Sequence, residues 1–446
     1  MRSTIITMIC ILSTTICSAN GMVGSWKGKL LMNFTSLNIV IHLTKDANNN
    51  WGATMDSPDQ MAYGIKMQTL YAQNDSISLT IPNLKINYQG KYSSDSIKGT
   101  FTQQGQQFPL NLDRFVDENI NNRPQTPQAP FPYTEQLVTF KNGEIELAGT
   151  MTLPKNIGKN KLPAILLIAG SGPIDRDENM FNHKPFAVIA DFFTKKGFIV
   201  LRYDKRGIGD SKGNFSTATT ADFTSDAQAA LAYLREVKHV DTQKIGVIGH
   251  SEGASIVFQL ANQKSINFMV SMAGPGISGG DILKRQVKIL TRNAPQFLTD
   301  YNKTIDYISA TQPDAIDESL VASCFSYLDS TSNGKERVQQ LTNALLTPWM
   351  VHFIQYNPCN DIKSIKRPLF AIHGAKDIHI EPELNLRSIE QCFTNKKLLT
   401  TKIYPNLNHL FQNSTTGMPN EYVQIKETID INVLNDIYLW ITNIIA

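Results

Sequence analysis

The sequence has little charge and little cysteine. Charged residues make up 18% of its 446 residues and the formal net charge is +3, so there is no basic excess to neutralise a nucleic-acid backbone. Its five cysteines are too few for a disulfide framework, and none has the CxxC spacing of zinc and thiol-redox sites. Beyond the N-terminus no run of 18 uninterrupted apolar residues occurs, so no membrane span is expected. A hydrophobic content of 41% nevertheless excludes a wholly disordered chain.

Residues 1–19 are typical of a signal peptide. Arg2 supplies the positive charge, residues 5–16 a short apolar core, and residues 17–19 a small-residue cleavage site. We therefore expect a secreted or periplasmic protein. A lipid anchor at Cys17 is the alternative, which the bulky Ile16 before it disfavours. Cleavage leaves an odd number of cysteines, so at least one thiol is free or pairs with another molecule; the pairing stays open among Cys324, Cys359 and Cys392.

Residues 20–115 predict a small all-β domain, a barrel or a sandwich, because short alternating runs are separated by Asn, Asp and Gly and no helical period appears. The predicted strands are 26–30, 37–43, 65–71, 77–81, 84–88 and 97–101. A packing role beside a catalytic domain is favoured over carbohydrate binding. Residues 116–133 contain three asparagines and four prolines and are expected to form a semi-rigid linker.

Residues 134–446 alternate strands with helices, which predicts a mostly parallel, doubly wound sheet covered on both faces. A hairpin over 135–153 comes first, with an Asn-Gly turn. Further apolar strands are expected at 164–168, 198–201, 244–248, 268–272, 368–372 and 401–404, with helices near 186–195, 222–237, 254–261 and 431–445. The stretch 280–361 is helical in texture and too long for a loop, so we interpret it as a cap insertion.

The pentapeptide GHSEG, residues 249–253, fits G-x-S-x-G between a predicted strand and a predicted helix. The glycines allow a tight turn that lifts the Ser251 hydroxyl to the sheet edge, at the positive end of the following helix. Ser251 is therefore the candidate nucleophile.

A serine nucleophile needs a base and an orienting acid, which follow it in the order Ser, acid, His in this arrangement. Asp377 comes just after the next-to-last strand and His409 just after the last one. Helix capping by Asp377 and a surface-loop role for His409 are the alternatives. His379 is the only rival base, although it lies on the acid's own loop. A metal site formed by His373, Asp377 and His379 explains Asp377 less well than the triad, so we expect no metal and no cofactor.

The oxyanion formed by nucleophilic attack needs backbone donors. We expect these from Glu252, which follows the nucleophile, and from the turn at Ser171 and Gly172 after the first long apolar strand. A dinucleotide fingerprint at Gly170-x-Gly172 is disfavoured, because Asp175 stands where the third glycine should be.

Two longer motifs carry a family resemblance: GSGPIDRD at residues 170–177 and LRYDKRGIGDS at residues 201–211. With the triad, they make residues 134–446 resemble an α/β-hydrolase. The chain resembles exported bacterial esterases near the serine aminopeptidase and prolyl-oligopeptidase branches of that superfamily. The resemblance implies carboxylic ester hydrolysis and often an extra N-terminal β-domain, to which residues 24–114 look similar.

Within these motifs, Asp175, Arg176 and Arg202 are expected either to bind polar substrate groups or, as favoured, to hold the oxyanion loop in place. The Glu252 side chain is expected to bind a substrate amine or to point at the Arg-rich loop.

The predicted function is a secreted serine esterase acting on a small-molecule ester. The alternatives are a serine aminopeptidase or dipeptidyl-peptidase-like enzyme, and a catalytically silent glycan-binding protein. Acyl-chain preference and oligomeric state are left open.

Overall fold

The computed structural model describes residues 19–446 except 33–34, 46–49, 58, 60–61, 74, 104, 116–122, 291–293 and 331–333. The predicted signal peptide lies outside these residues except for Ala19, as does the alternative lipidation site Cys17. The chain divides into two compact units, residues 1–121 and 122–446. Within the described part of the chain, no helix combines the length and the apolar character needed to cross a membrane.

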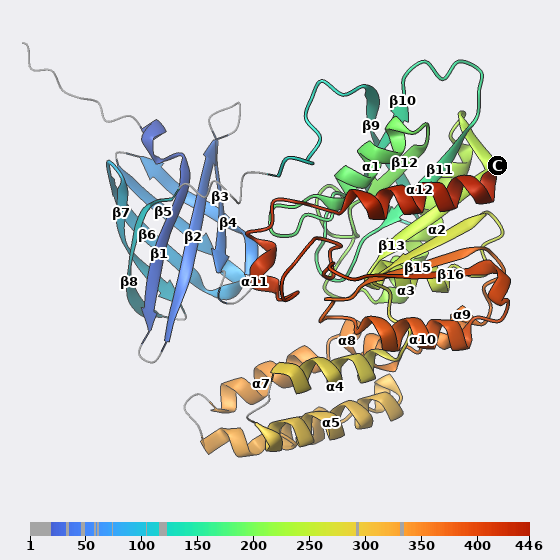
Figure 1. Ribbon diagram of the computed structural model, residues 1–446. Coiled ribbons are helices and arrows are strands. Elements are labelled where there is room, and N and C mark those ends of the chain that lie inside the picture. Colours follow the sequence, from blue (N-terminus) through green and yellow to red (C-terminus); the bar gives the residue numbers. More distant parts are fainter. Residues whose placement is uncertain are drawn as a thin grey trace, which may run out of the picture. The chain divides into compact units, whose positions relative to one another are not determined.

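The first unit is an eight-stranded antiparallel barrel, drawn in blue tones in Figure 1. Each strand pairs with the next, and β1 pairs with β8 to close the barrel. The predicted all-β domain is thus confirmed. Its strands are β1 (Gly24–Met32), β2 (Thr35–Lys45), β3 (Trp51–Ser57), β4 (Ala62–Gln73), β5 (Ser76–Ile81), β6 (Ile86–Ser93), β7 (Ser96–Gln103) and β8 (Gln106–Phe115), with 3-10 turns η1 (Ala19–Met22) and η3 (Pro82–Leu84).

Two of these strands, β3 and β8, are absent from the sequence prediction. The polar and small residues of β3, WGATMDS, hide its alternation. In β8, Pro109 and the polar residues around it do the same. The predicted strand at 84–88 starts too early, because residues 82–84 form η3.

Large side chains fill the barrel interior. Trp26, Tyr88 and Phe101 are almost completely buried. Gly90 and Gly99 face each other on β6 and β7, and a Cβ on Gly99 would lie 2.7 Å from the Tyr88 ring. These two glycines therefore make room for the tyrosine, and the barrel is a packed core.

The second unit is built on an eight-stranded sheet in the order β16-β15-β14-β13-β11-β12-β10-β9. The hairpin β9–β10 and the β10–β12 pair are antiparallel, and the other pairs are parallel. This confirms the predicted mostly parallel sheet. The strands are β9 (Tyr133–Asn142), β10 (Ile145–Pro154), β11 (Leu162–Ile168), β12 (Ile199–Tyr203), β13 (Val240–His250), β14 (Phe268–Met272), β15 (Leu369–Gly374) and β16 (Leu399–Tyr404).

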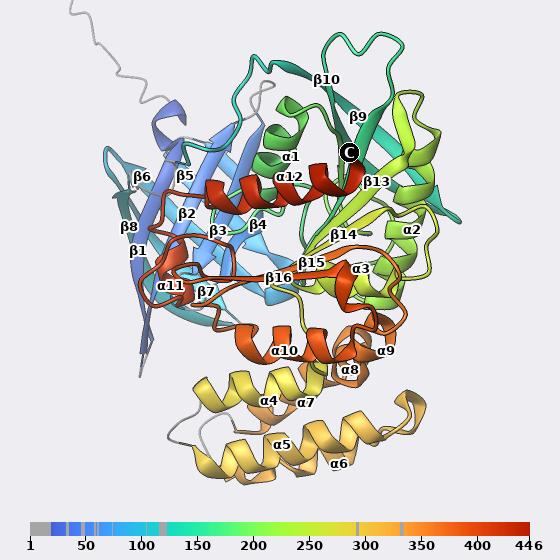
Figure 2. The same ribbon diagram turned by 45° about the vertical axis from the view of Figure 1, so that its right-hand side comes forward.

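Helices cover both faces of this sheet (Figure 2). One face packs against α1 (Pro185–Lys195) and α12 (Ile431–Ile445). The other packs against α2 (Thr220–Glu236), α3 (Glu252–Gln259), α9 (Cys359–Ile362) and α10 (Pro382–Cys392). Buried apolar side chains form both layers, as expected for a parallel sheet. Short helices η6 (Lys396–Leu398) and α11 (Pro419–Tyr422) lie on either side of β16 in the chain.

The cap inserted after β14 has a hydrophobic cluster of its own, which includes Ile305, Phe325 and Ile354. In both views it forms a separate helical layer next to α10 (Figures 1 and 2). It consists of α4 (Gly279–Leu290), α5 (Pro295–Ala310), η4 (Pro313–Ala315), α6 (Glu318–Ser323), η5 (Ser326–Ser330), α7 (Gly334–Leu345) and α8 (Pro348–Gln355).

The structure resolves the open cysteine pairing. Cys359 in α9 forms a disulfide with Cys392 at the end of α10, 33 residues later, and Cys324 is a free thiol. The bridge ties the segment that leaves the cap to a helix packed on the sheet.

Candidate active site

Ser251 occupies a strained turn between β13 and α3. Its backbone has φ 54° and ψ −116°, a conformation that residues with a Cβ rarely adopt. A Cβ on Gly253 would collide with the carbonyl of Ile168, and one on Gly249 with the carbonyl of Gly253. The two glycines of the motif are therefore required by close backbone contacts, and the turn presents Ser251 at the start of α3.

Asp377 and His409 meet at the ends of β15 and β16. The Asp377 Oδ2 atom lies 2.7 Å from His409 Nδ1. Its Oδ1 atom accepts hydrogen bonds from the amides of His379, at 2.8 Å, and Ile380, at 2.9 Å. Burial alone raises the pKa of Asp377, but His409, His373 and the Ile380 amide hold it below its usual range. An ionised acid thus fixes the His409 ring, as an acid–base pair requires.

The rival base His379 is close to this pair but differently placed. Its ring centroid lies 5.0 Å from that of His409, and burial lowers its pKa to about 4. His373, which belongs to the disfavoured metal alternative, is buried and donates through Nε2 to the carbonyl of Gly274. Among the residues that the structure describes, no group of three or more His, Cys, Asp or Glu side chains is arranged to hold a metal.

The predicted oxyanion turn lies against the nucleophile. A Cβ on Gly170 would lie 3.3 Å from the Ser251 Cβ. The Gly170 amide donates to Glu178 Oε1 at 2.8 Å, whereas the amides of Ser171 and Gly172 donate to no acceptor in the described parts of the chain. The Glu252 amide opens α3 and has no acceptor inside the helix. The three predicted amides are therefore available to a ligand oxygen.

The Glu252 side chain, unlike its backbone amide, binds other residues of the protein, among them Lys205 of the Arg-rich loop. It accepts hydrogen bonds from Lys205 Nζ at 2.7 Å, from Thr220 Oγ1 at 2.6 Å and from Trp349 Nε1 at 2.6 Å. Burial raises its pKa, but Lys205 and the two other donors bring it below the usual value. The carboxylate thus has three partners within the protein, one of which, Trp349, belongs to the cap.

Arg176 and Arg202 also bind acidic side chains of the protein. Arg176 binds Asp204 through its backbone amide and its guanidinium, and it binds Asp210 at 2.7 Å. Arg202 donates to Asp177 at 2.8 Å and to Glu135 at 3.2 Å.

Asp175 plays a local role in the same loop. Its Oδ1 atom accepts the amides of Asp177 and Asn179. Together with the two arginines it holds the segment after the oxyanion turn against the β12 loop.

A hydrogen-bonded pair that the sequence does not predict lies beneath the site. His250, just before the nucleophile, places Nδ1 3.0 Å from Glu178 Oε1 and Nε2 3.0 Å from the carbonyl oxygen of His409. Glu178 and His250 are 1% and 3% exposed. The only sequence signal for this pair is that Glu178 directly follows GSGPIDRD and His250 belongs to GHSEG.

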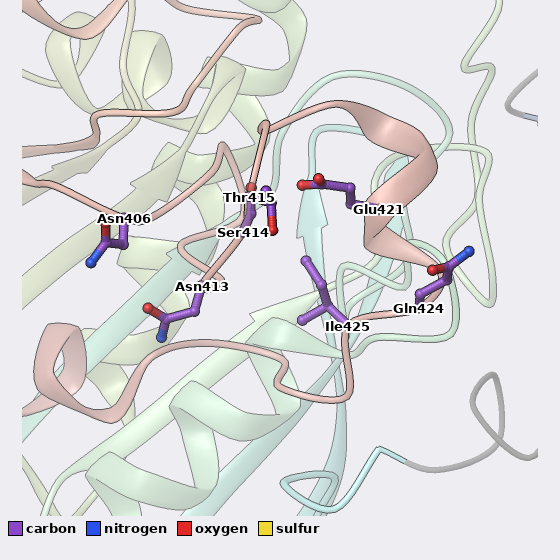
Figure 3. A pocket seen from close by; sticks show the side chains of 7 residues that line it. All are labelled: Asn406, Asn413, Ser414, Thr415, Glu421, Gln424 and Ile425. Carbon is purple, nitrogen blue, oxygen red and sulfur yellow. The ribbon is translucent and has the colours of Figure 1, made fainter.

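The loop that carries His409 also lines a polar hollow of about 480 Å³ (Figure 3). Glu421 points into it but accepts hydrogen bonds from the amides of Thr416 and Gly417. Asn413 is bound to Glu427 and Asp430. These bonds shape the histidine loop. The lining residues are Asn406, Asn413, Ser414, Thr415, Glu421, Gln424 and Ile425.

The barrel contains a second Ser–His–Asp trio. Ser25 Oγ lies 2.7 Å from His42 Nδ1, and His42 Nε2 lies 2.8 Å from Asp56 Oδ2. Ser25 is part of a regular strand paired with both neighbours, without the turn and helix start that supply oxyanion donors at Ser251. This trio therefore links the outer faces of β1, β2 and β3 and is a poor candidate for catalysis.

Comparison with known proteins identifies the family of this chain. The family model described as "Serine aminopeptidase, S33" matches residues 183–415. Esterase EstD of Thermotoga maritima is 26% identical over 350 residues, which cover 77% of this chain and 73% of EstD. Among solved structures, a hypothetical protein of Pseudomonas aeruginosa is 17% identical, with a TM-score of 0.46, over 72% of this chain and 98% of its own. A Pyrococcus furiosus esterase is 19% identical, with a TM-score of 0.40, over 61% and 82%. Because the matched family segment spans more than half of the sequence and contains Ser251, Asp377 and His409, the chain belongs to the serine aminopeptidase S33 family of α/β-hydrolases.

Proposed function

We propose that this hydrolase is an exported serine esterase that cleaves small carboxylic esters through Ser251, His409 and Asp377. The observation that carries the proposal is the buried Asp377–His409 contact of 2.7 Å next to a strained serine turn. The relationship to an esterase of Thermotoga maritima supports an ester substrate.

The chemistry follows from the protonation states. Asp377 accepts the Nδ1–H of His409, which leaves Nε2 free to take the proton from Ser251 Oγ as this oxygen attacks the ester carbonyl. The amides of Glu252 and Ser171 stabilise the oxyanion. His409 then protonates the leaving alcohol. A water molecule, activated in the same way, attacks the acyl-enzyme and releases the carboxylic acid.

Substitution of Ser251 tests the proposal. Ser251→Ala should lower the hydrolysis of nitrophenyl acyl esters by about 10³-fold or more and abolish labelling by a fluorophosphonate. Ser25→Ala is the matched control, because it removes the hydroxyl of the other Ser–His–Asp trio, and it should leave both readouts unchanged. Full esterase activity in Ser251→Ala would overturn the proposal. An unlabelled wild-type protein that binds glycans would instead favour a catalytically silent binding protein.

A peptidase acting at a free N-terminus is the second candidate, favoured by the description of the family model. Such an enzyme needs an acid for the substrate amine, yet Glu178, Glu252 and Asp377 are each paired with a cationic or histidine side chain. Asp175 lacks such a partner among the described ion pairs, and burial raises its pKa. Prolyl and aminoacyl nitroanilides should therefore be poor substrates. Fast cleavage that falls in Asp175→Asn would favour the peptidase.

Export is part of the proposal. It rests on the signal-like residues 1–19 and on the Cys359–Cys392 disulfide, since disulfides persist in oxidising compartments. Mass spectrometry of the protein expressed from its full reading frame should find a mature chain that starts near residue 20. A lipid on Cys17 would instead show the anchored form, and an uncleaved cytosolic chain would contradict export.

A further inference from the structure

We propose that Glu178 and His250 form a buried ion pair that positions the oxyanion turn, the nucleophile and the catalytic histidine relative to one another. This inference rests on the proposed esterase mechanism and deepens it, because neither residue belongs to the triad. Both are positioning residues, which act through Gly170, Ser251 and His409.

The contacts join three segments that are far apart in the sequence. Glu178 Oε1 accepts the Gly170 amide at 2.8 Å and lies 3.0 Å from His250 Nδ1. His250 Nε2 lies 3.0 Å from the carbonyl oxygen of His409. Gly170 directly precedes the oxyanion donor Ser171, His250 directly precedes Ser251, and His409 is the base. The pair thus contacts the backbone of Gly170 and of His409, and His250 is covalently joined to Ser251.

The His250 ring lies between two hydrogen-bond acceptors, Glu178 Oε1 and the carbonyl oxygen of His409. A backbone carbonyl only accepts hydrogen bonds, and so does an ionised carboxylate that already receives an amide. With Glu178 ionised, both ring nitrogens of His250 donate, and the pair consists of an imidazolium and a carboxylate. Burial alone lowers the pKa of His250, but Glu178, the His409 carbonyl and Asp377 raise it above the usual value.

The backbone of Glu178 supports the same interpretation. Glu178 has φ 54°, a left-handed conformation that is unfavourable for a residue with a Cβ. Strain of this kind persists where surrounding contacts determine the conformation, and it clusters at functional sites. The turn aims the carboxylate inward, where it is 1% exposed.

Breaking one side of a buried pair leaves an uncompensated charge or an unpaired polar group. In Glu178→Gln, His250 loses the charge that keeps it doubly protonated, so one of its two bonds must weaken. In His250→Gln, the carboxylate loses its cation. We expect each variant to lower kcat by about 10- to 100-fold with KM within about twofold, because neither side chain touches the substrate.

The double variant Glu178→Gln/His250→Gln separates positioning from simple damage. It removes both charges and restores a neutral pair, so its kcat should be no lower than that of the worse single variant. The affinity of a boronic-acid transition-state analogue should fall in parallel with kcat/KM, while a ground-state competitive inhibitor should bind unchanged. Glu383→Gln, on the exposed start of α10, is the charge-matched control and should behave as wild type.

The rate of Ser251 labelling by a fluorophosphonate is the decisive readout, because it needs no knowledge of the natural ester. A wild-type protein that is not labelled would overturn the proposed function. A labelled wild type whose folded Glu178→Gln and His250→Gln variants react at the same rate would overturn the positioning role alone. Folding is checked by near-ultraviolet circular dichroism. If the single variants do not fold, the double variant is compared with wild type: slower labelling is expected, and labelling at the wild-type rate would contradict the inference.

Discussion

Trp349 on cap helix α8 donates a hydrogen bond from Nε1 to Glu252 Oε1, 2.6 Å away and 97 residues earlier in the chain. Glu252 also supplies one of the amides expected to stabilise the oxyanion. A second contact joins the cap to the acid loop, because Gln286 of α4 donates to the carbonyl of His379 at 2.8 Å. The cap is therefore connected both to the start of α3, beside Ser251, and to the loop that carries Asp377.

Trp349→Phe should lower both the stability and the activity of the protein. The substitution removes one hydrogen-bond donor from the buried Glu252 carboxylate but keeps an aromatic ring. Hydrogen bonds to charged groups contribute about 1.5–3 kcal/mol, so we expect a loss of that size in the free energy of unfolding, measured with urea, and a lower kcat. Trp440→Phe is the matched control, since its Nε1 reaches only an exposed hydroxyl, Thr400 Oγ1. Equal effects of the two substitutions would contradict the special role of Trp349.

Arg176→Lys should impair activity although the charge is kept. The guanidinium binds Asp204 through two nitrogens and also reaches Asp210, a pattern that a lysine ammonium cannot reproduce. Because residues 170–178 include the oxyanion turn, we expect kcat to fall by about tenfold with little change in KM. Arg285→Lys, in an exposed pair with Glu381, should be silent, and a silent Arg176→Lys would argue against this loop contact.

Stability should fall below neutral pH because of His183. The ring is fully buried between Thr428 and the Tyr422 carbonyl, and burial lowers its pKa to about 4. A histidine with a depressed folded-state pKa stabilises the fold above its usual pKa of about 6.5 and loses this contribution as the pH falls toward 4, because the unfolded chain takes up the proton first. The contribution at stake is about 3 kcal/mol.

The test compares wild type with His183→Gln, whose side chain does not titrate. Urea unfolding at pH 7 should show the variant to be less stable, and the difference in free energy should shrink by about 2 kcal/mol at pH 4.5. A difference that stays constant between the two pH values would rule out this explanation.

Reduction of the Cys359–Cys392 bridge should destabilise the protein by about 3–4 kcal/mol, the loop-closure value for a separation of 33 residues. Thiol titration of an unfolded chain that begins at residue 20 should give one group before reduction, Cys324, and three afterwards. Cys324→Ser should leave the free energy of unfolding almost unchanged, whereas Cys359→Ser/Cys392→Ser should reproduce the effect of reduction. Three thiols without reductant would contradict the pairing.

Local signals explain why much of this fold is predictable. The turn at Asn142-Gly143, the apolar strand ending at Ile168 and the pattern around Ser251 each combine strong propensity with clear boundaries. Strand β3 is missed because Gly52, Ala53 and Asp56 carry no β signal, and only its barrel neighbours make it a strand.

Contacts between residues that are far apart in the sequence are harder to predict. Nothing in the sequence brings Glu178 to His250, 72 residues away, or Trp349 to Glu252, because these contacts depend on how the sheet orders its strands and where the cap folds back. The Cys359–Cys392 pairing is likewise a result of α9 and α10 lying side by side. Motif order indicates which residues react, and the tertiary structure decides what holds them in place.

The left-handed backbone at Ser251 has a consequence for obtaining a substrate complex. A residue with a Cβ in such a conformation destabilises the fold by about 1–3 kcal/mol, and glycine relieves most of that strain. An inactive Ser251→Gly protein should thus be more stable than the active enzyme, so that catalysis and robustness oppose each other at this single position. For trapping an uncleaved ester in crystals, glycine is therefore a better replacement than alanine.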